Sequence, residues 1–308
     1  MNSLLKFGYA CRVATVTWGR MRTFLAVVDH GSVRAAATFL HVTEPAVSSA
    51  VAQIERRLAT ELLARDGRGV RLTEAGRVYA HYCRRILGLI DEAAAAVQTA
   101  ETGRLRIGAV ATASEHVLPR LLATFRQRFP EVELNLSVLP RDDLFEELAQ
   151  HETDVVFAGR PPPGSGLVTR ARRENTLVVV SAPGRFPDPV SATWLLRGPG
   201  SGTRDTTFGL LTQLEASPPT LTLGTHGAVV AAAREGLGVT LVHADAVGDD
   251  LETGALEQVA LASTPLDRPW HVATADTPTR SAQLFLAHVT SPDEVGDAAF
   301  YLYNRTAG

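Results

Sequence analysis

The sequence has very little cysteine and no long hydrophobic run, and each absence excludes a class of protein. Only two cysteines occur in 308 residues, and neither Cys11 nor Cys83 lies in a CxxC motif or a Cys/His cluster. We therefore expect no disulfide framework, no metal site and no cofactor. No apolar run approaches the roughly 18–20 residues that cross a bilayer, which predicts a cytoplasmic protein without a membrane partner.

Signatures of catalysis are also missing. A hydrolase nucleophile needs the spacing Gly-x-Ser-x-Gly, which the two Gly-Ser-Gly runs at 164–166 and 200–202 lack. The sequence has no HExxH motif, no Walker loop and no GxGxxG motif, and its nine histidines are scattered. We expect no catalytic residues and no enzymatic activity.

Residues 1–17 precede the first convincing secondary structure. They carry Lys6 and Arg12 but no uninterrupted apolar core with a small-residue cleavage site, which argues against a signal peptide. We interpret them as a disordered extension or as a misassigned start, with the true start nearer Val13, Val16 or Met21.

The overall charge of −3 hides an uneven distribution. Residues 1–100 hold 13 basic and 8 acidic side chains, whereas the remainder holds 17 and 25. A basic N-terminal part joined to an acidic remainder suggests that only the first part meets a polyanion.

Residues 21–58 predict three short helices. Gly31 ends the first, Ser32 caps the second, and Thr43 caps the third, whose first turn holds Glu44 and Pro45. Two helices joined by a tight turn form a helix-turn-helix, whose second helix can enter the major groove of DNA. A plain three-helix cluster remains the alternative at this point.

A predicted hairpin at residues 62–72 strengthens the DNA interpretation. Two short strands flank a glycine-containing turn, and arginines lie at 65, 68 and 71. Such a wing suits contact with phosphates or the minor groove. The residues expected to contact DNA are Arg34, Thr43, Glu44, Pro45, Ala46, Ser48, Ser49, Gln53, Arg65, Arg68 and Arg71.

The run from Phe24 to Arg77, FLAVVDHGSVRAAATFLHVTEPAVSSAVAQIERRLATELLARDGRGVRLTEAGR, resembles the signature of LysR-type transcriptional regulators. One departure concerns specificity, because Ser49, Ala50 and Ala52 stand where this family usually carries basic or amide side chains. Glu44 also replaces a common glutamine; it repels phosphate but can accept a hydrogen bond from cytosine N4.

Residues 73–100 continue as one helix with an apolar stripe that needs a partner. Packing on its own domain is one alternative. The resemblance implies instead that two such helices pair antiparallel in a symmetric dimer, or within a tetramer. The residues expected at that interface are Val78, Tyr82, Ile86, Leu89 and Ala93.

Alternating strand and helix signals follow Gly103 and predict a parallel α/β sheet. A Pro-rich run at 160–166 marks a first crossover, and the chain crosses back near 264–268. Two lobes joined by two crossovers resemble a type 2 periplasmic-binding-protein fold, the effector domain of the family. The predicted parts are an extension at 1–17, a winged helix-turn-helix at 18–76, a linker helix at 77–102 and an effector domain at 103–308, with lobe I at 103–160 and 269–308 and lobe II at 161–268.

Three helix starts in the effector domain are candidates for binding an anion, because helix N-termini present free N–H groups. The run 198–204 is similar to a GSGTR motif found in a subset of these regulators, including ones that control carbon or sulfur assimilation. A capped turn without a ligand remains the alternative. The residues expected at the effector site are Thr112, Ser114, Arg160, Ser201, Gly202, Thr203, Arg204, Thr225 and His226.

The sequence therefore predicts a DNA-binding transcriptional regulator controlled by a small anionic metabolite between two lobes. Its expected partners are double-stranded DNA, the effector, a second copy of itself and RNA polymerase. A ligand-independent architectural DNA-binding protein is the main alternative.

Overall fold

The computed structural model describes residues 16–67, 69–96 and 103–303. The chain divides into two compact units, of which the first holds the chain as far as Ala94 and the second almost all of the rest. Most of the expected N-terminal extension, Arg68 and the end of the expected linker at 97–102 lie outside the described residues. Each unit is considered by itself.

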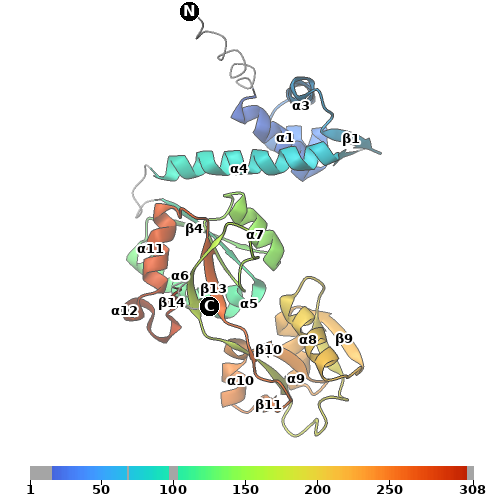
Figure 1. Cartoon of the computed structure of the whole chain (residues 1–308), viewed down its shortest axis with the longest axis vertical. Coiled ribbons are helices and arrows are strands. Elements are labelled where there is room, and N and C mark those ends of the chain that lie inside the picture. The colour runs from blue at the N-terminus through green and yellow to red at the C-terminus, as the bar shows by residue number, and fades with distance from the viewer. Residues whose placement is uncertain (1–15, 68, 97–102, 304–308) are drawn as a thin grey trace, which may run out of the picture. The chain divides into compact units, whose positions relative to one another are not determined.

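The first unit is a helix-turn-helix with a wing and a long helix (Figure 1). Its elements are α1 (Trp18–His30), α2 (Val33–Leu40), α3 (Glu44–Leu58), β1 (Leu63–Asp66), β2 (Gly69–Leu72) and α4 (Glu74–Ala96). Gly31 ends α1 at φ 69°, Ser32 caps α2 by accepting from the Ala35 N–H, and Thr43 caps α3 by accepting from the Ala46 N–H.

The first helix begins three residues earlier than the expected Met21. The Thr17 carbonyl accepts the N–H groups of Arg20 and Met21, which starts the helix at Trp18. Val16 packs against the core of this unit, so the ordered structure reaches into the expected extension.

Backbone contacts fix the wing against the helices. The Glu55 carboxylate on α3 accepts from the N–H groups of Leu62 and Leu63, at 2.8 and 3.1 Å. The Val70 N–H donates to the Gly31 carbonyl, and a Cβ at Gly69 would lie 2.9 Å from that same oxygen. Glycine at 69 therefore permits the close approach of the wing to the end of α1.

The boundary expected between residues 76 and 77 falls inside α4, the helix that the sequence predicts from residue 73 onward. Thr73 caps α4 by accepting the Gly76 N–H at 2.9 Å, so the helix starts at Glu74 directly after the wing. A Cβ at Gly76 would lie 2.0 Å from the Leu62 carbonyl, which shows how tightly this first turn packs on the hairpin.

In the second unit, lobe I is a six-stranded sheet in the order β14-β6-β13-β5-β3-β4. Its strands are β3 (Arg104–Ala109), β4 (Glu133–Val138), β5 (Val155–Ala158), β6 (Val168–Arg173), β13 (Trp270–Thr274) and β14 (Tyr301–Leu302). Its helices are α5 (Ala111–His116), α6 (Leu118–Arg128), α7 (Arg141–Ala149), α11 (Arg280–Val289) and α12 (Pro292–Val295), followed by the single turn η3 (Gly296–Ala298).

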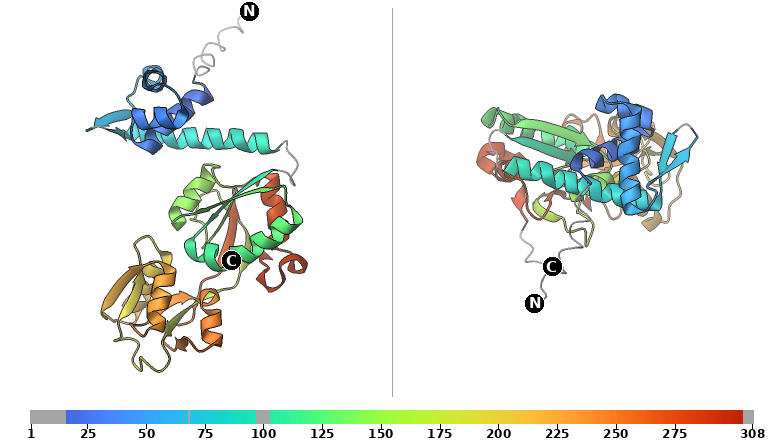
Figure 2. Two further views of the ribbon diagram at one scale, coloured as in Figure 1. Left: turned by 180° about the vertical axis from the view of Figure 1, so that it is seen from behind. Right: turned by 90° about the horizontal axis from the view of Figure 1, so that it is seen from above.

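The lobe I sheet is covered on both faces. Along β5, Val155 and Phe157 pack into the cluster that holds α6 and α11, whereas Val156 and Ala158 pack against α7. Figure 1 and the view from behind in Figure 2 show α11 and α7 on opposite sides of the strands. This alternation explains why β5 reads as an unbroken apolar run.

The segment after β3 forms two helices, α5 and α6, instead of one continuous helix. Pro119 lies in the first turn of α6 and has no N–H to donate to the carbonyl of Glu115, one turn earlier. The chain therefore turns at Val117, and the short α5 starts directly after β3.

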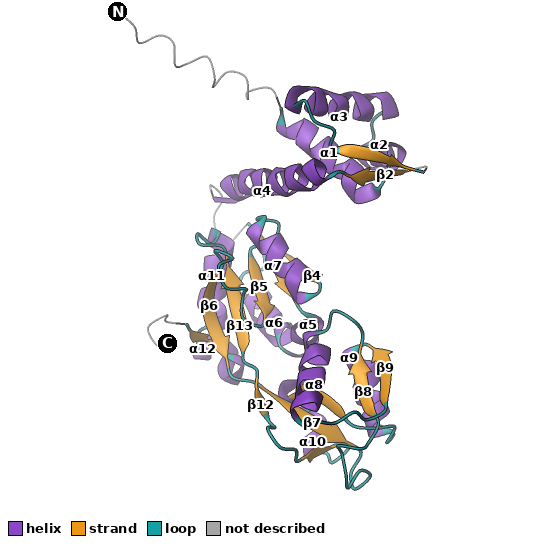
Figure 3. Cartoon of the chain, turned by 45° about the vertical axis from the view of Figure 1, so that its right-hand side comes forward, coloured by secondary structure: helices purple, strands orange, loops and turns teal. Residues whose placement is uncertain are grey.

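Lobe II has strands on either side of β7. Its strands are β7 (Thr176–Ser181), β8 (Trp194–Arg197), β9 (Thr220–Gly224), β10 (Thr240–His243), β11 (Glu257–Val259) and β12 (Leu266–Asp267). Its helices are α8 (Gly202–Gln213), α9 (His226–Arg234) and α10 (Gly248–Glu252), with the single turn η2 (Ala244–Ala246). Figure 3 shows these helices and strands as a body distinct from lobe I.

The first crossover lies later than expected. Residues 161–173 were assigned to lobe II, but β6 pairs antiparallel with β13, and Ala171 is buried in the lobe I core. The chain enters lobe II between Arg173 and Thr176, and it returns between Asp267, which pairs with Thr176, and Trp270. The Pro-rich run at 160–166 is thus a loop of lobe I.

The described helices include none with the length and apolar character needed to cross a membrane.

Candidate functional site

The first unit presents the start of α3 as an open surface. Glu44, Pro45, Ala46, Ser48 and Ser49 are exposed, while Val47, Val51 and Ile54 on the opposite face are buried. The Gln53 amide donates to Ser49 Oγ at 3.0 Å, which joins two residues expected to contact bases. The exposed face is therefore polar, small and free of arginine over its first turns.

Cationic side chains flank that surface. Arg34 on α2, Arg65 on β1 and Arg71 on β2 are exposed, and no ion pair holds any of them within the described ranges. Arg68 at the wing tip lies outside those ranges. Unpaired, exposed guanidinium groups are suited to phosphate oxygens.

The long helix α4 has two apolar faces. Ala80, Cys83 and Leu87 are buried in the core of the first unit. The opposite stripe is exposed, at 52% for Val78, 54% for Tyr82, 40% for Ile86 and 48% for Leu89, and Ala93 continues it.

A shallow apolar groove of about 370 Å³ adjoins the N-terminal half of this stripe. Leu58, Leu62, Val78, Tyr79 and Tyr82 line it. Packing on its own domain therefore accounts for only one face of α4.

The second unit contains a cavity of about 310 Å³ between its lobes. Lobe I contributes Thr112 from the start of α5 and the run 138–141 after β4, and lobe II contributes the run 197–203. Among the described residues that line it there is no aspartate or glutamate, whereas Arg141, Arg197 and Arg268 are all present. The described lining therefore offers positive charge and no carboxylate, although Arg141 forms an ion pair with Asp142 outside the lining.

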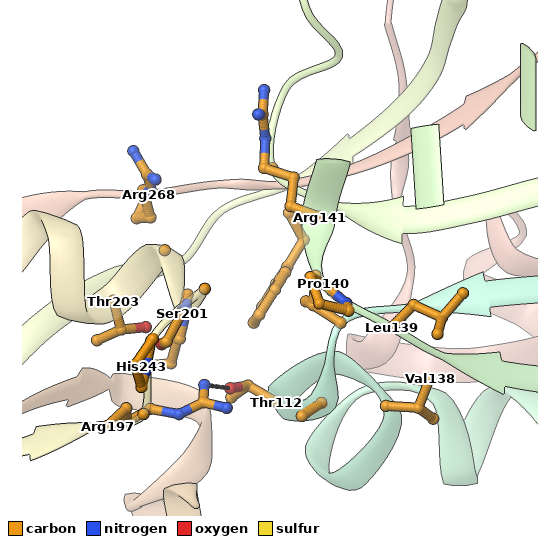
Figure 4. Close-up of a pocket in the computed structure, with 18 of the residues that line it drawn as sticks. Thr112, Val138, Leu139, Pro140, Arg141, Arg197, Ser201, Thr203, His243 and Arg268 are labelled. Atoms are coloured by element: carbon orange, nitrogen blue, oxygen red, sulfur yellow. Dashed lines mark hydrogen bonds between the residues drawn. The ribbon is translucent and has the colours of Figure 1, made fainter. Parts of the chain in front are cut away.

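Arg197 forms the base of the cavity, where its Nη1 donates to Thr112 Oγ1 at 3.1 Å across the two lobes (Figure 4). Its Nε is buried and has no hydrogen-bond partner among the described residues, and neither does the buried Ser201 Oγ. Burial lowers the pKa of Arg197, although the charge of Glu115 opposes this. A buried guanidinium whose Nε–H has no acceptor favours an anion at this position.

The N-terminus of α8 points into the same region. Ser201, Gly202 and Thr203 line the cavity, as the sequence predicts. A Cβ at Gly202 would lie 3.9 Å from Nη2 of Arg268, so this guanidinium lies beside the helix start. The Arg141 guanidinium instead points away from Arg197 and donates to the Arg160 carbonyl at 2.6 Å.

Five residues expected at the effector site do not line this cavity. Ser114 Oγ donates to the Ala111 carbonyl, and Thr225 caps α9. Arg160 is exposed and lies outside the cavity. Arg204 donates to the Arg197 carbonyl and to Thr222, so it stabilises the strand end that carries Arg197. His226 is buried, with its ring 5.1 Å from that of His116.

Buried histidines surround the cavity. Burial first, and then the charges of His116 and Arg197, lower the pKa of His226 to about 4. Burial likewise lowers the pKa of His243 to about 3, and this side chain lines the cavity beside Trp270. Both imidazoles are therefore neutral at pH 7 and add no positive charge.

The sequence did not point to Arg197, Arg268, His243 or Trp270 as site residues. Arg197 ends a strand one residue before the glycine run, and that adjacency was the available signal. Arg268 lies on the return crossover and Trp270 follows it, so they reach the cavity only through the long-range pairing of β12 and β13.

Family models match both parts of the chain. Residues 18–77 match the bacterial regulatory helix-turn-helix protein, lysR family, and residues 98–291 match the LysR substrate binding domain.

Individual proteins agree with these matches. The chain is 33% identical to the HTH-type transcriptional regulator CfxR of Cupriavidus necator over 84% of this chain and 85% of that protein. It is 32% identical to the regulator CbbR of Rhodospirillum rubrum, over 82% and 88%.

Among solved structures, a full-length OxyR variant from Pseudomonas aeruginosa has a similar fold, with a TM-score of 0.66 at 20% identity over 87% of this chain and 92% of that one. The Synechocystis CcmR regulatory domain in complex with 2-PG aligns with a TM-score of 0.54 at 25% identity, over 60% of this chain and 94% of that one. Together with the two family matches, these likenesses show that the chain belongs to the LysR family of transcriptional regulators.

Proposed function

We propose that this regulator binds a small anionic metabolite in the interlobe cavity, against Arg197 and the N-terminus of α8. The observation that carries the proposal is the buried, unpartnered Nε of Arg197 in a cavity whose described lining holds no carboxylate. A bound carboxylate, sulfate or phosphate group would accept from that donor and compensate the desolvated charge.

Further donors surround the same point. The Ser201 hydroxyl, the first N–H groups of α8 and the guanidinium of Arg268 lie around one end of the cavity. Partial positive charge at a helix start adds to the charge of the two arginines. The CcmR regulatory domain, a structural neighbour, was solved in complex with 2-PG, which supports a small-molecule ligand in the second unit of this chain.

The opposite wall limits what the rest of the ligand can be. Val138, Leu139 and Pro140 supply apolar surface from lobe I, and Pro269 does so from the return crossover. A compact metabolite with an acidic group at one end fits this division of polar and apolar surface, and 310 Å³ suits a molecule of a few carbon atoms.

The first unit supplies the DNA contact in this proposal. The start of α3 reads base edges through Ser48, Ser49 and Gln53, and Arg34, Arg65 and Arg71 hold phosphates on either side. The exposed stripe of α4 pairs with the same stripe of a second copy, because a two-fold interface is self-complementary. The resulting dimer presents two such surfaces to DNA and, once bound, acts on RNA polymerase.

Calorimetry tests the ligand site. The full-length chain is titrated with inorganic phosphate, sulfate, acetate and 2-PG, and we expect at least one of these to bind. Arg197→Gln removes the charge and the free Nε donor, and it should weaken that binding by about tenfold or more, as for a charge-assisted hydrogen bond of about 1.5–3 kcal/mol.

Two matched variants control this experiment. Arg126→Gln removes an exposed arginine of α6 outside the cavity, and it should bind as the wild type does. Thr203→Val should weaken binding, whereas Thr225→Val, at the start of a helix outside the cavity, should not. Equal affinities for wild type and Arg197→Gln, or binding of cationic or apolar ligands alone, contradict the proposal.

A ligand-independent architectural role makes a different prediction. Genomic footprinting of the tagged chain would then show the same occupancy in every growth condition. Occupancy or footprint length that changes between conditions supports control by a metabolite.

A further inference from the structure

Six residues at the crossovers form two hydrogen-bonded groups that a ring stack joins, and we call them together the hinge cluster: Arg173, Asp245 and Trp270 in one group, and Asn175, His243 and Arg268 in the other. Arg173 ends β6 and Trp270 begins β13, so both belong to the sheet of lobe I. His243 ends β10 and Asp245 lies in η2, both in lobe II. Asn175 and Arg268 lie on the two crossovers themselves.

Asp245 joins lobe II to both crossover strands. Its Oδ2 accepts the Trp270 Nε1–H at 2.7 Å and also forms an ion pair with Arg173. The Arg173 guanidinium lies over the ring of Phe300, 5.6 Å from its centroid, and that ring is buried in the core of lobe I. One carboxylate of lobe II therefore connects to two anchors in lobe I.

Asn175 holds the two crossovers to each other. Its carbonyl accepts the Arg268 N–H at 2.9 Å, and its Nδ2 donates to the Arg268 carbonyl at 3.1 Å. The same Nδ2 lies 2.6 Å from His243 Nδ1. Because His243 is neutral, its Nδ1 can accept this hydrogen bond.

Three members of the cluster also line the cavity: His243, Arg268 and Trp270. The indole of Trp270 stacks on the imidazole of His243, with centroids 4.3 Å apart and planes at 21°. A molecule in this part of the cavity can contact the two rings that bond to Asp245 and Asn175. The ligand site and the return crossover therefore share residues, and no intervening loop has to transmit a change from one to the other.

We propose that the hinge cluster sets the angle between the two lobes, with Asp245 as its positioning residue. A ligand against Arg268 and Trp270 then changes the lobe angle through this cluster. The second half of the proposal rests on the proposed function, whereas the first half holds for the ligand-free chain as well. Coupling of this kind requires the ligand to interact differently with the two arrangements, and contacts with cluster residues that move with the lobe angle would provide that difference.

Spin labels on the two lobes test the first half without any ligand. Ala123 on α6 and Ala231 on α9 are exposed and small, so Ala123→Cys and Ala231→Cys accept labels in a Cys11→Ser background, while the native Cys83 is buried. Interlobe distances in the full-length chain are measured by pulsed electron–electron double resonance. An excess of unlabelled chain ensures that only pairs within one molecule contribute.

Asp245→Asn should convert a single distance peak into a broader distribution, because the neutral amide loses the ion pair with Arg173 and accepts more weakly from the Trp270 N–H. Trp270→Phe keeps an aromatic ring on His243 but removes the N–H donor, and it should broaden the distribution as well. The matched control is Asp250→Asn, because Asp250 pairs with Arg234 entirely within lobe II and should leave the distribution unchanged.

Addition of inorganic phosphate separates this proposal from the proposed function. A phosphate-induced shift in the wild type that is absent in Asp245→Asn supports both. If phosphate and 2-PG shift nothing but Asp245→Asn still broadens the ligand-free distribution, the ligand class is wrong and the hinge cluster stands. Ligand-free distributions that coincide in wild type, Asp245→Asn and Trp270→Phe overturn the hinge cluster, whatever phosphate does.

Discussion

At the scale of single residues, the second unit depends on histidines that are buried without charge. Burial lowers the pKa of His226 and of His271 to about 4 and that of His243 to about 3, compared with 6.5 for an exposed histidine. The Nε2 atoms of His226 and His271 are buried and have no partner among the described residues. Between pH 6.5 and 4, these histidines therefore bind fewer protons in the folded chain than in the unfolded chain.

This difference predicts a loss of stability in acid. Above pH 6.5 both states hold these histidines neutral, so their contribution is fully present there. As the pH falls from 6.5 towards 4, the unfolded state takes up protons first, and each histidine lowers the free energy of unfolding by at most about 1.4 kcal/mol per pH unit. Denaturant unfolding at several pH values measures this slope.

The variant that isolates one such histidine is His226→Gln. Its unfolding free energy should depend less steeply on pH between 6.5 and 4 than that of the wild type. His41→Gln, which changes an exposed histidine of the first unit, should keep the wild-type slope. Identical slopes for wild type and His226→Gln would count against a neutral, buried His226.

At the scale of elements, we expect the wing to bind phosphates and α3 to contact base edges. Arg65→Ala or Arg71→Ala removes one exposed cation from the wing, and it should weaken binding to all sequences alike. The slope of log affinity against log salt should flatten by about 0.9 for each phosphate that the variant no longer neutralises. Fluorescence anisotropy with specific and unrelated duplexes between low and moderate salt gives both quantities.

Ser49→Ala should behave differently, because a hydroxyl on α3 carries no charge. Its salt slope should match the wild type, while discrimination between base pairs changes by about 1–3 kcal/mol if the hydroxyl bonds to a base edge. Arg126→Ala, on α6 of the second unit, should change neither quantity. A wing variant that keeps the full slope would exclude the wing from phosphate binding.

Helix α4 is the element that we expect to join two copies. Ile86→Glu or Leu89→Glu places a carboxylate in its exposed apolar stripe, and burying an unpaired charge costs several kcal/mol. Analytical ultracentrifugation should show a shift from dimer, or tetramer, towards monomer. The control is Arg85→Glu, which adds the same group to α4 beside the stripe. An unchanged sedimentation coefficient for both stripe variants would place the interface elsewhere.

At the scale of the whole molecule, short sequence motifs predicted where helices and strands form. Which lobe a strand belongs to depends instead on its pairing with strands far away in the sequence. Gly31, Ser32 and Thr43 act within a few residues, so the helix-turn-helix could be predicted from them. The assignment of β6 to lobe II was wrong because the sequence of a strand does not show which strand it pairs with. The partner of β6 is β13, which lies about a hundred residues later in the chain. Because β6 follows the Pro-rich run, the sequence predicted that it belongs to lobe II. In the structure its Ala171 is buried in the core of lobe I.

The same difference between local motifs and long-range pairing explains which cavity residues the sequence predicted. Ser201, Gly202 and Thr203 were predictable because a glycine turn before a helix offers anion-binding groups by itself. Thr112 was predictable for the same reason, since it follows β3 and opens α5. Arg268 and Trp270 depend on how the return crossover packs, and Arg160 was misplaced because the chain crosses later than its prolines suggested.

The exposed stripe of α4 has a consequence for how this regulator responds to its own amount. If a second copy covers Val78, Tyr82, Ile86 and Leu89, folding and association share one equilibrium, and dilution favours the open, less stable chain. The number of copies in the cell then determines how much DNA-competent dimer exists before any metabolite binds. In that case the expression level is a second signal that controls the regulator, because it sets how many copies are paired through α4.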